Sequence, residues 1–120
     1  MGHPQQNSYQ VEAITVQVLD EVHLEKQTLG NHQLKREVLQ LFLVQIEMLM
    51  ERIEQVTTDE TRLAAAHTIK GSARNIGAWA VAEQAAFLEK ADKNNLSSVT
   101  NDLRCATNVV CRQIREMLVD

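Results

Sequence analysis

The chain is poor in the residues that break helices. Its 120 residues include one proline and four glycines. Sandwiches and barrels need many Gly- and Pro-containing turns, so the composition argues against an all-β fold. It also lacks the composition of disordered and collagen-like chains. Helix-favouring residues are plentiful, and the length fits one compact domain with its own core.

Excess positive charge and long apolar runs are also missing. The net charge is −4, whereas general nucleic-acid binding needs a basic surface over the phosphates. No stretch reaches the roughly 18 apolar residues of a membrane span. Residues 1–10 are polar, without the apolar centre of a signal peptide, and we expect them to form a flexible tail. We therefore expect neither nucleic acid nor membrane as a partner.

The chain has two cysteines, Cys105 and Cys111, six positions apart in one predicted helix. At this spacing they point to different sides and cannot pair with each other. Two unpaired thiols fit a reducing compartment, so we expect a cytoplasmic protein in which both are buried as small apolar residues. The four histidines show no metal-ligand spacing with each other or with the cysteines, so we expect no metal site.

Apolar residues repeat at spacings of three and four along most of the chain, which predicts helices. A short first helix begins at Val11 or Asp20 and ends at Leu29. Asp20 can cap it, and Gly30 suits the left-handed position after its end. Four longer helices are predicted over residues 32–56, 57–76, 78–93 and 97–118.

The ends of the longer helices carry their own signals. Thr57 with Glu60 fits a capping box at the start of the second long helix, and Gly77 suits its end. In the first long helix, apolar residues at three-and-four spacing predict a wide buried face with further apolar residues on its flank. The residues expected on that face are Leu34, Val38, Leu41, Phe42, Leu49 and Ile53.

Four long helices with short connections predict an all-α fold. Neighbouring helices then run antiparallel, as in an up-and-down four-helix bundle, here with a short extra N-terminal helix. We expect residues 11–120 to form this one domain, and we expect it to be a monomer.

The helix over residues 57–76 places one histidine away from the core. At 100° per residue, its apolar positions fall on one side, and His67 lies roughly opposite to them. Lys70, Gly71 and Arg74 lie beside His67 on the outer face. Taken alone, these could be ordinary solvated residues. Glycine inside a helix costs about 1 kcal/mol relative to alanine, so a close approach by a partner is a reasonable cause for Gly71.

The segment around this histidine resembles the signature of histidine-containing phosphotransfer (HPt) domains. That pattern is histidine, any residue, leucine or isoleucine, lysine, glycine, and a second glycine six residues later. The chain has all of these positions, namely His67, Ile69, Lys70, Gly71 and Gly77. The family is a four-helix bundle of about this length, and residues 18–118 fit it.

The resemblance implies a phosphorelay carrier without catalytic turnover of its own. His67 would accept a phosphoryl group from a receiver-domain aspartate or a histidine kinase and pass it to another receiver. An imidazole is largely neutral near pH 7, which leaves a ring nitrogen free to attack phosphorus. Lys70 would stabilise charge on the phosphoryl oxygens. No cofactor is expected, and the Mg²⁺ that the reaction requires would come with the receiver.

Glu89, 22 residues after His67, has two interpretations. Several HPt domains carry glutamine or glutamate there, facing the histidine, where it would fix the tautomer and leave Nε2 as the nucleophile. Alternatively, Glu89 is a solvated residue that pairs with Lys90 or Lys93 on its own helix.

The expected partner is a response-regulator receiver domain, a hybrid histidine kinase, or both, docked over His67. The residues expected to contact it are Leu63, Ala64, Gly71, Arg74 and Asn75. Two alternatives remain open at this point. One is an HPt-like docking module that is not phosphorylated, and the other is a structural helical bundle in which the motif is accidental.

Overall fold

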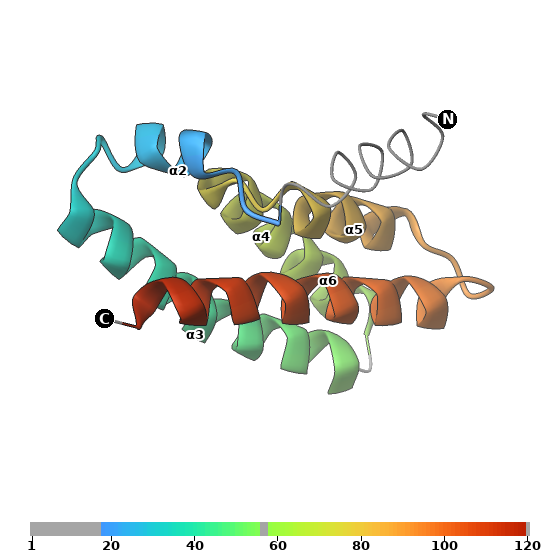
Figure 1. Cartoon of the computed structure of the whole chain (residues 1–120). Helices are drawn as coiled ribbons and strands as arrows, with labels where there is room; N and C mark the ends of the chain where they lie inside the picture. Colours follow the sequence, from blue (N-terminus) through green and yellow to red (C-terminus); the bar gives the residue numbers. More distant parts are fainter. Residues whose placement is uncertain (1–17, 56–57, 120) are drawn as a thin grey trace, which may run out of the picture.

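The computed structural model describes residues 18–55 and 58–119, and every regular element within these ranges is a helix (Figure 1). This confirms the all-α prediction with a short helix before the bundle. The predicted tail and a helix start at Val11 lie outside the described residues. The helices are α2 (Glu21–Gln27), α3 (His32–Gln55), α4 (Asp59–Ile76), α5 (Trp79–Lys90) and α6 (Leu96–Leu118).

The four long helices form a closed ring. In this ring α3 packs on α4, α4 on α5, α5 on α6 and α6 on α3, while the short α2 packs on α4. Each long helix contributes buried apolar side chains to one shared core, including Phe42, Ile69, Leu88 and Leu103. The ring places α4 and α5 on one edge of the bundle and α3 and α6 on the opposite edge.

Several helix ends differ slightly from the predicted positions, including the end of α2 at Gln27 instead of Leu29, and two of the differences have a clear cause. The hydroxyl of Thr58 accepts a hydrogen bond from the Thr61 N–H at 3.2 Å, so Thr58 caps α4. The predicted cap, Thr57, lies outside the described residues. Helix α5 ends at Lys90, before the predicted end at residue 93, because the Asp92 carboxylate accepts from the backbone N–H groups of Asn94 and Asn95 and forms a turn.

Gly77 fixes the sharp junction between α4 and α5. Its φ of +85° lies in the left-handed region, and its N–H bonds to carbonyls of the last α4 turn. A Cβ at this position would lie 2.8 Å from the backbone oxygen of Asp20. Glycine is therefore required by both conformation and space, and α5 begins only two residues later.

A small polar network attaches α2 to this junction. The Asp20 N–H donates to the Gly77 carbonyl at 2.9 Å, and the Trp79 indole N–H donates to the Asp20 carboxylate at 3.0 Å. The indole and the His23 backbone amide hold the pKa of Asp20 below its ordinary value. The His23 ring packs on Trp79, and its Nε2 lies 2.9 Å from the Arg74 carbonyl oxygen.

The predicted inner face of α3 is partly wrong. Leu41 is 66% exposed and Leu34 36% exposed, although both were expected in the core. The described helix has apolar residues around most of its circumference, so spacing alone did not identify the stripe that turns inward. The buried residues of α3 are Leu39, Phe42, Ile46, Leu49, Met50 and Ile53.

The cysteine prediction holds for one residue only. Cys111 is buried, whereas Cys105 is exposed on α6. Neither is in a disulfide.

None of the described helices is long and apolar enough to cross a membrane.

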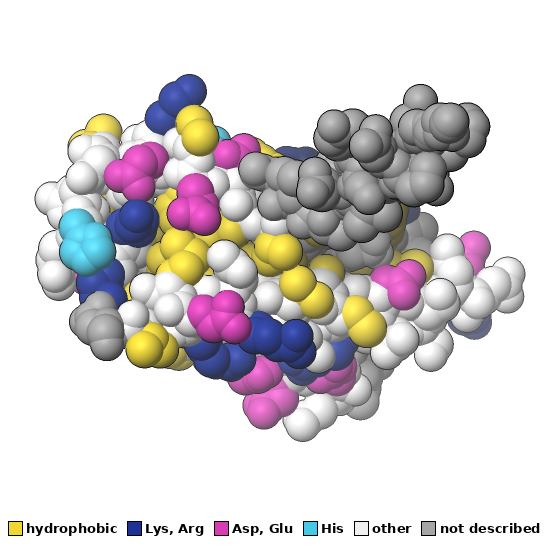
Figure 2. All heavy atoms as spheres, viewed as in Figure 1, with side chains coloured by type: hydrophobic (Ala, Val, Ile, Leu, Met, Phe, Trp, Pro, Cys, Tyr) yellow, Lys and Arg dark blue, Asp and Glu magenta, His cyan; other side chains and the backbone are white. Residues whose placement is uncertain are grey.

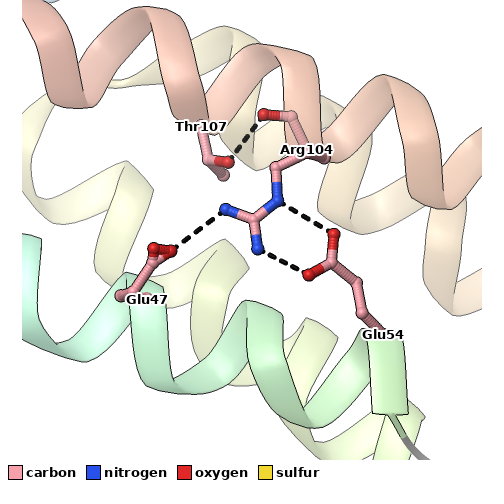
Figure 3. Close-up of polar contacts among 4 residues, drawn as sticks. All are labelled: Glu47, Glu54, Arg104 and Thr107. Atoms are coloured by element: carbon pink, nitrogen blue, oxygen red, sulfur yellow. Dashed lines mark hydrogen bonds and ion pairs between the residues drawn. The ribbon is translucent and has the colours of Figure 1, made fainter.

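Arg104 on α6 joins that helix to α3. Figure 3 shows the side chains of Glu47 and Glu54 pointing from α3 toward its guanidinium group. Its Nε and Nη2 donate to the two carboxylate oxygens of Glu54 at 2.9 and 2.6 Å, and Nη1 donates to Glu47 at 3.1 Å. Such a two-pronged contact is stronger than a single surface ion pair. Arg104 also holds the pKa of Glu54 below its ordinary value of 4.5.

Replacing Arg104 with glutamine should lower the free energy of unfolding by about 1 kcal/mol at pH 7, since the group is partly exposed and screened. A lowered carboxyl pKa stabilises the fold above the ordinary value of 4.5, and this contribution is lost as the pH falls through the lowered pKa. Urea unfolding of both proteins should therefore show a difference that shrinks in acid. Arg112→Gln, on the same helix, is the control. A difference that persists unchanged in strong acid would contradict this account.

Candidate functional site

His67 lies in the middle of α4, with its side chain 74% exposed. The buried residues of this helix are the ones that the helical wheel places inward, namely Ala65, Ala66, Ile69, Ala73 and Ile76. The opposite side of α4 therefore faces solvent, as expected from the sequence, and carries the imidazole outward.

Glu89 reaches His67 from the neighbouring helix. The His67 Nδ1 lies 3.1 Å from the Glu89 Oε2. The contact depends on the register of α5 against α4, which the Gly77 junction sets. Among the described residues the ion-pair partners of Glu89 are His67 and Lys70, so the interpretation of Glu89 as a solvated partner of Lys90 or Lys93 is wrong.

Lys70 pairs with the other oxygen of the same carboxylate. Its Nζ lies 2.5 Å from the Glu89 Oε1, and the side chains of Lys70 and Glu89 are only 20% and 22% exposed. The Lys70 ammonium, and next the His67 ring, hold the pKa of Glu89 below its ordinary value of 4.5. Glu89 is therefore ionised at neutral pH and bridges the lysine and the histidine.

The ionised carboxylate determines where the neutral His67 ring carries its proton. A carboxylate has no proton to donate, so Nδ1 must be the donor in this contact. The other ring nitrogen, Nε2, is then unprotonated in the neutral ring. It has no hydrogen-bond partner among the described residues. An exposed nitrogen with a free lone pair can act as a nucleophile.

Replacing Glu89 with alanine should change the tautomer of His67. In the wild-type protein the neutral ring should carry its proton on Nδ1, because the carboxylate accepts it. Without the carboxylate, the Nε2–H form should gain population. Ring ¹⁵N chemical shifts measured at a pH where the ring is neutral report the two forms. An unchanged tautomer in Glu89→Ala, with Glu83→Ala on the same helix as control, would remove Glu89 from the site.

The outer side of α4 also carries the residues predicted to contact a partner. All of them are exposed, and they surround the imidazole along the helix: Leu63, Ala64, Gly71, Arg74 and Asn75. A Cβ on Gly71 would meet nothing within 4 Å. Packing inside the chain therefore gives no reason for glycine at this position.

The helical spacing of α3 does not reveal that this helix carries an exposed apolar strip. Leu41, Val44 and Met48 lie three and four residues apart on one side of the helix and are 66%, 67% and 48% exposed. Leu41 borders the same shallow groove as Ser72 and Asn75 of α4. Leu41 thus brings one end of this strip next to the outer side of α4. The signal was present as an excess of apolar residues beyond what one buried face of α3 can use.

No metal-binding set accompanies the site in the described parts of the chain. Within residues 18–55 and 58–119, no three His, Cys, Asp or Glu side chains gather closely enough to hold a metal ion. The arrangement that is present is an exposed imidazole, a carboxylate that orients it and an ammonium group that neutralises the carboxylate.

The comparison with protein families gives a match that covers most of the described residues. The family model of the Hpt domain matches residues 37–119, which include α4, α5 and α6 completely. No curated protein and no solved structure matches the chain. The match covers well over half of the sequence and contains His67, Lys70 and Glu89.

Proposed function

The chain belongs to the Hpt domain family, and we propose that it carries a phosphoryl group on the Nε2 atom of His67. Hpt domains transfer phosphoryl groups through a histidine in phosphorelays, and they interact with receiver domains or histidine kinases. The observation that best supports the assignment to His67 is its geometry. Its ring is exposed, its Nδ1 is held by Glu89 and its Nε2 is open.

The proposed step is a displacement at phosphorus. The Nε2 lone pair attacks the phosphorus of a receiver aspartyl phosphate, an N–P bond forms, and the P–O bond to the aspartate breaks. The aspartate leaves as a carboxylate with the bonding electron pair. The ring then keeps its proton on Nδ1 and gains positive charge, which the Glu89 carboxylate stabilises. The reverse step passes the phosphoryl group from His67 to the aspartate of another receiver. In both steps this chain carries the phosphoryl group and does not catalyse a reaction of its own.

Lys70 is the cation best placed to act on the phosphoryl group. It follows His67 by three residues and so lies one helical turn away on the same side. In the unphosphorylated protein its ammonium is bound to Glu89. Arrival of a phosphoryl group adds negative charge beside this pair, and the ammonium can then interact with phosphoryl oxygens as well. Phosphoryl transfer also needs Mg²⁺, which we assign to the acidic pocket of the receiver.

The proposed docking surface is the outer side of α4 together with the adjoining strip of α3. It combines small residues around His67 with the exposed apolar side chains Leu41, Val44 and Met48. An apolar area beside small residues lets another protein approach closely. Arg74, exposed one turn beyond Lys70, adds a positive charge to this surface.

Mixing the protein with a phosphorylated receiver domain tests this proposal. We expect label to appear on the wild-type protein as acid-labile, alkali-stable phosphate, the behaviour of a phosphohistidine. His67→Gln should accept none, while His32→Gln, an exposed histidine at the start of α3, should accept it normally. A protein that binds receivers but never takes the label would be a docking module. One that neither binds nor takes the label would be a structural bundle.

Replacing Gly71 with alanine should have opposite effects on stability and transfer. The free energy of unfolding of the isolated protein should rise by about 1 kcal/mol, since alanine favours helix and its Cβ meets no atom within 4 Å. Transfer from a receiver should slow, because the added methyl group lies beside His67 where the partner must approach. Chemical denaturation and phosphotransfer kinetics measure the two effects. A stabilised variant that transfers at the wild-type rate would show that Gly71 is not needed for docking.

A further inference from the structure

A second concave surface lies between α3 and α6, on the edge of the bundle opposite His67. It is a groove of about 430 Å³ that runs along the second half of α6. This volume is within the range of small-molecule sites in proteins. None of the residues assigned to phosphotransfer lines it. The ring order of the helices places it across the bundle from the α4–α5 edge.

The floor of this groove is apolar and closely packed. Ile46, Thr107 and Cys111 line it and are 3%, 1% and 7% exposed. The Thr107 hydroxyl donates a hydrogen bond to the Arg104 carbonyl at 2.9 Å, so it is not free to donate to a ligand. Burial raises the pKa of the Cys111 thiol, which is therefore neutral at pH 7. The floor of the groove therefore carries no charged group.

The rim of the groove carries positive charge that the fold does not use. Arg104 is neutralised by Glu47 and Glu54, as described above. Arg112 and Arg115 also line the groove, and both are exposed without an ion-pair partner among the described residues. Glu116 is the one remaining acid on this rim. Figure 2 shows Lys and Arg side chains gathered over α6 and α3 on this face, with acidic side chains beside them.

We propose that this groove binds a small organic anion, with a carboxylate or phosphate group attached to an apolar body. The anionic group lies between Arg112 and Arg115. Each planar guanidinium group can donate two parallel hydrogen bonds to the oxygens of a carboxylate or phosphate. The apolar body covers Ile46 and Cys111. Because His67 does not line the groove, a bound ligand leaves its imidazole free. The inference does not depend on the assignment of His67.

NMR titration of the ¹⁵N-labelled protein with three probes tests the proposal. Naphthalene-2-carboxylate combines both features, naphthalene-2-carboxamide lacks the charge, and inorganic phosphate lacks the apolar body. We expect the carboxylate to shift the backbone amides of Thr107, Asn108, Cys111 and Arg112, and to bind about tenfold more tightly than the carboxamide. Equal binding of the carboxylate and the carboxamide would overturn the role of the arginines. Phosphate binding as tight as that of the carboxylate would overturn the role of the floor.

Two variants separate this site from general surface attraction. The double variant Arg112→Gln/Arg115→Gln should bind the carboxylate about as weakly as the wild-type protein binds the carboxamide. Arg52→Gln removes an exposed arginine from α3 outside the groove and should leave binding unchanged. Shifts that spread over the outer side of α4 instead of α6 would place the binding elsewhere and contradict the proposal.

Discussion

Replacing Lys70 with alanine should slow phosphoryl transfer to His67 about a hundredfold. Removing one preorganised group that stabilises developing charge commonly costs a factor of about 100 to 1,000. The fold should tolerate the change, since Lys70 is on the outer half of α4 and is not part of the core. Rapid-mixing kinetics with a phosphorylated receiver measure the rate. Lys90→Ala, which removes an exposed lysine next to Glu89 in sequence, should transfer at the wild-type rate.

The same variant should change the titration of Glu89. Lys70 contributes most to the lowered pKa of this carboxyl group, so in Lys70→Ala the pKa should rise toward the ordinary value of 4.5. In the wild-type protein the pair stabilises the fold above that value, and this contribution is lost as the pH falls through the lowered pKa. The Glu89 carboxyl ¹³C shift follows the titration. If Lys70→Ala raises the pKa of Glu89 but transfers the phosphoryl group at the wild-type rate, then Lys70 acts on Glu89 and not on the phosphoryl group.

Replacing Gly77 with alanine should destabilise the protein by about 3 kcal/mol. The left-handed conformation costs a residue with a Cβ about 1 kcal/mol or more. Overpacking typically adds about 1–3 kcal/mol, and here the new Cβ would lie 2.8 Å from a backbone oxygen of Asp20 and 2.9 Å from its Cβ. Neither neighbour is the end of a flexible side chain, so the junction itself must move.

Gly30 provides the matched control for this prediction. Its φ of +67° is also left-handed, but an added Cβ would have only a Glu25 carboxylate oxygen nearby, at 4.0 Å. Gly30→Ala should therefore lower the free energy of unfolding by about 1 kcal/mol, because it has the conformational cost but no steric clash. Urea denaturation of both variants measures the difference. Equal losses of stability in the two variants would mean that the backbone at Asp20 can move away from residue 77 at no cost in free energy. That would contradict the role of the polar network that attaches α2 to α4 and α5.

The sequence predicted α4 well for a simple physical reason. Its inward residues are apolar and most of its outward residues are small or polar, so the direction of His67 follows from helical spacing alone. The helix α3 has apolar residues on most sides, so the same method assigned Leu34 and Leu41 to the core incorrectly. The exposed strip with Leu41 became visible only after the neighbours of α3 were known.

The role of Glu89 could not be decided from the sequence because it depends on two helices. Its distance from His67 is set by how α5 lies against α4, and that register depends on the Gly77 turn and the short junction. Spacing within α5 equally allowed pairs with Lys90 or Lys93. The sequence also does not predict the pairing of Lys70 with Glu89, because the motif relates each of them to His67 and not to each other.

The central claim is that His67 accepts the phosphoryl group on Nε2 while Glu89 holds Nδ1. The most direct measurement is NMR of the phosphorylated protein with ¹⁵N-labelled histidine, in which phosphorus–nitrogen coupling identifies the bonded ring atom. We predict coupling to Nε2 of His67, with the proton retained on Nδ1. Coupling to Nδ1, or a phosphoryl group on any other residue, would contradict the account.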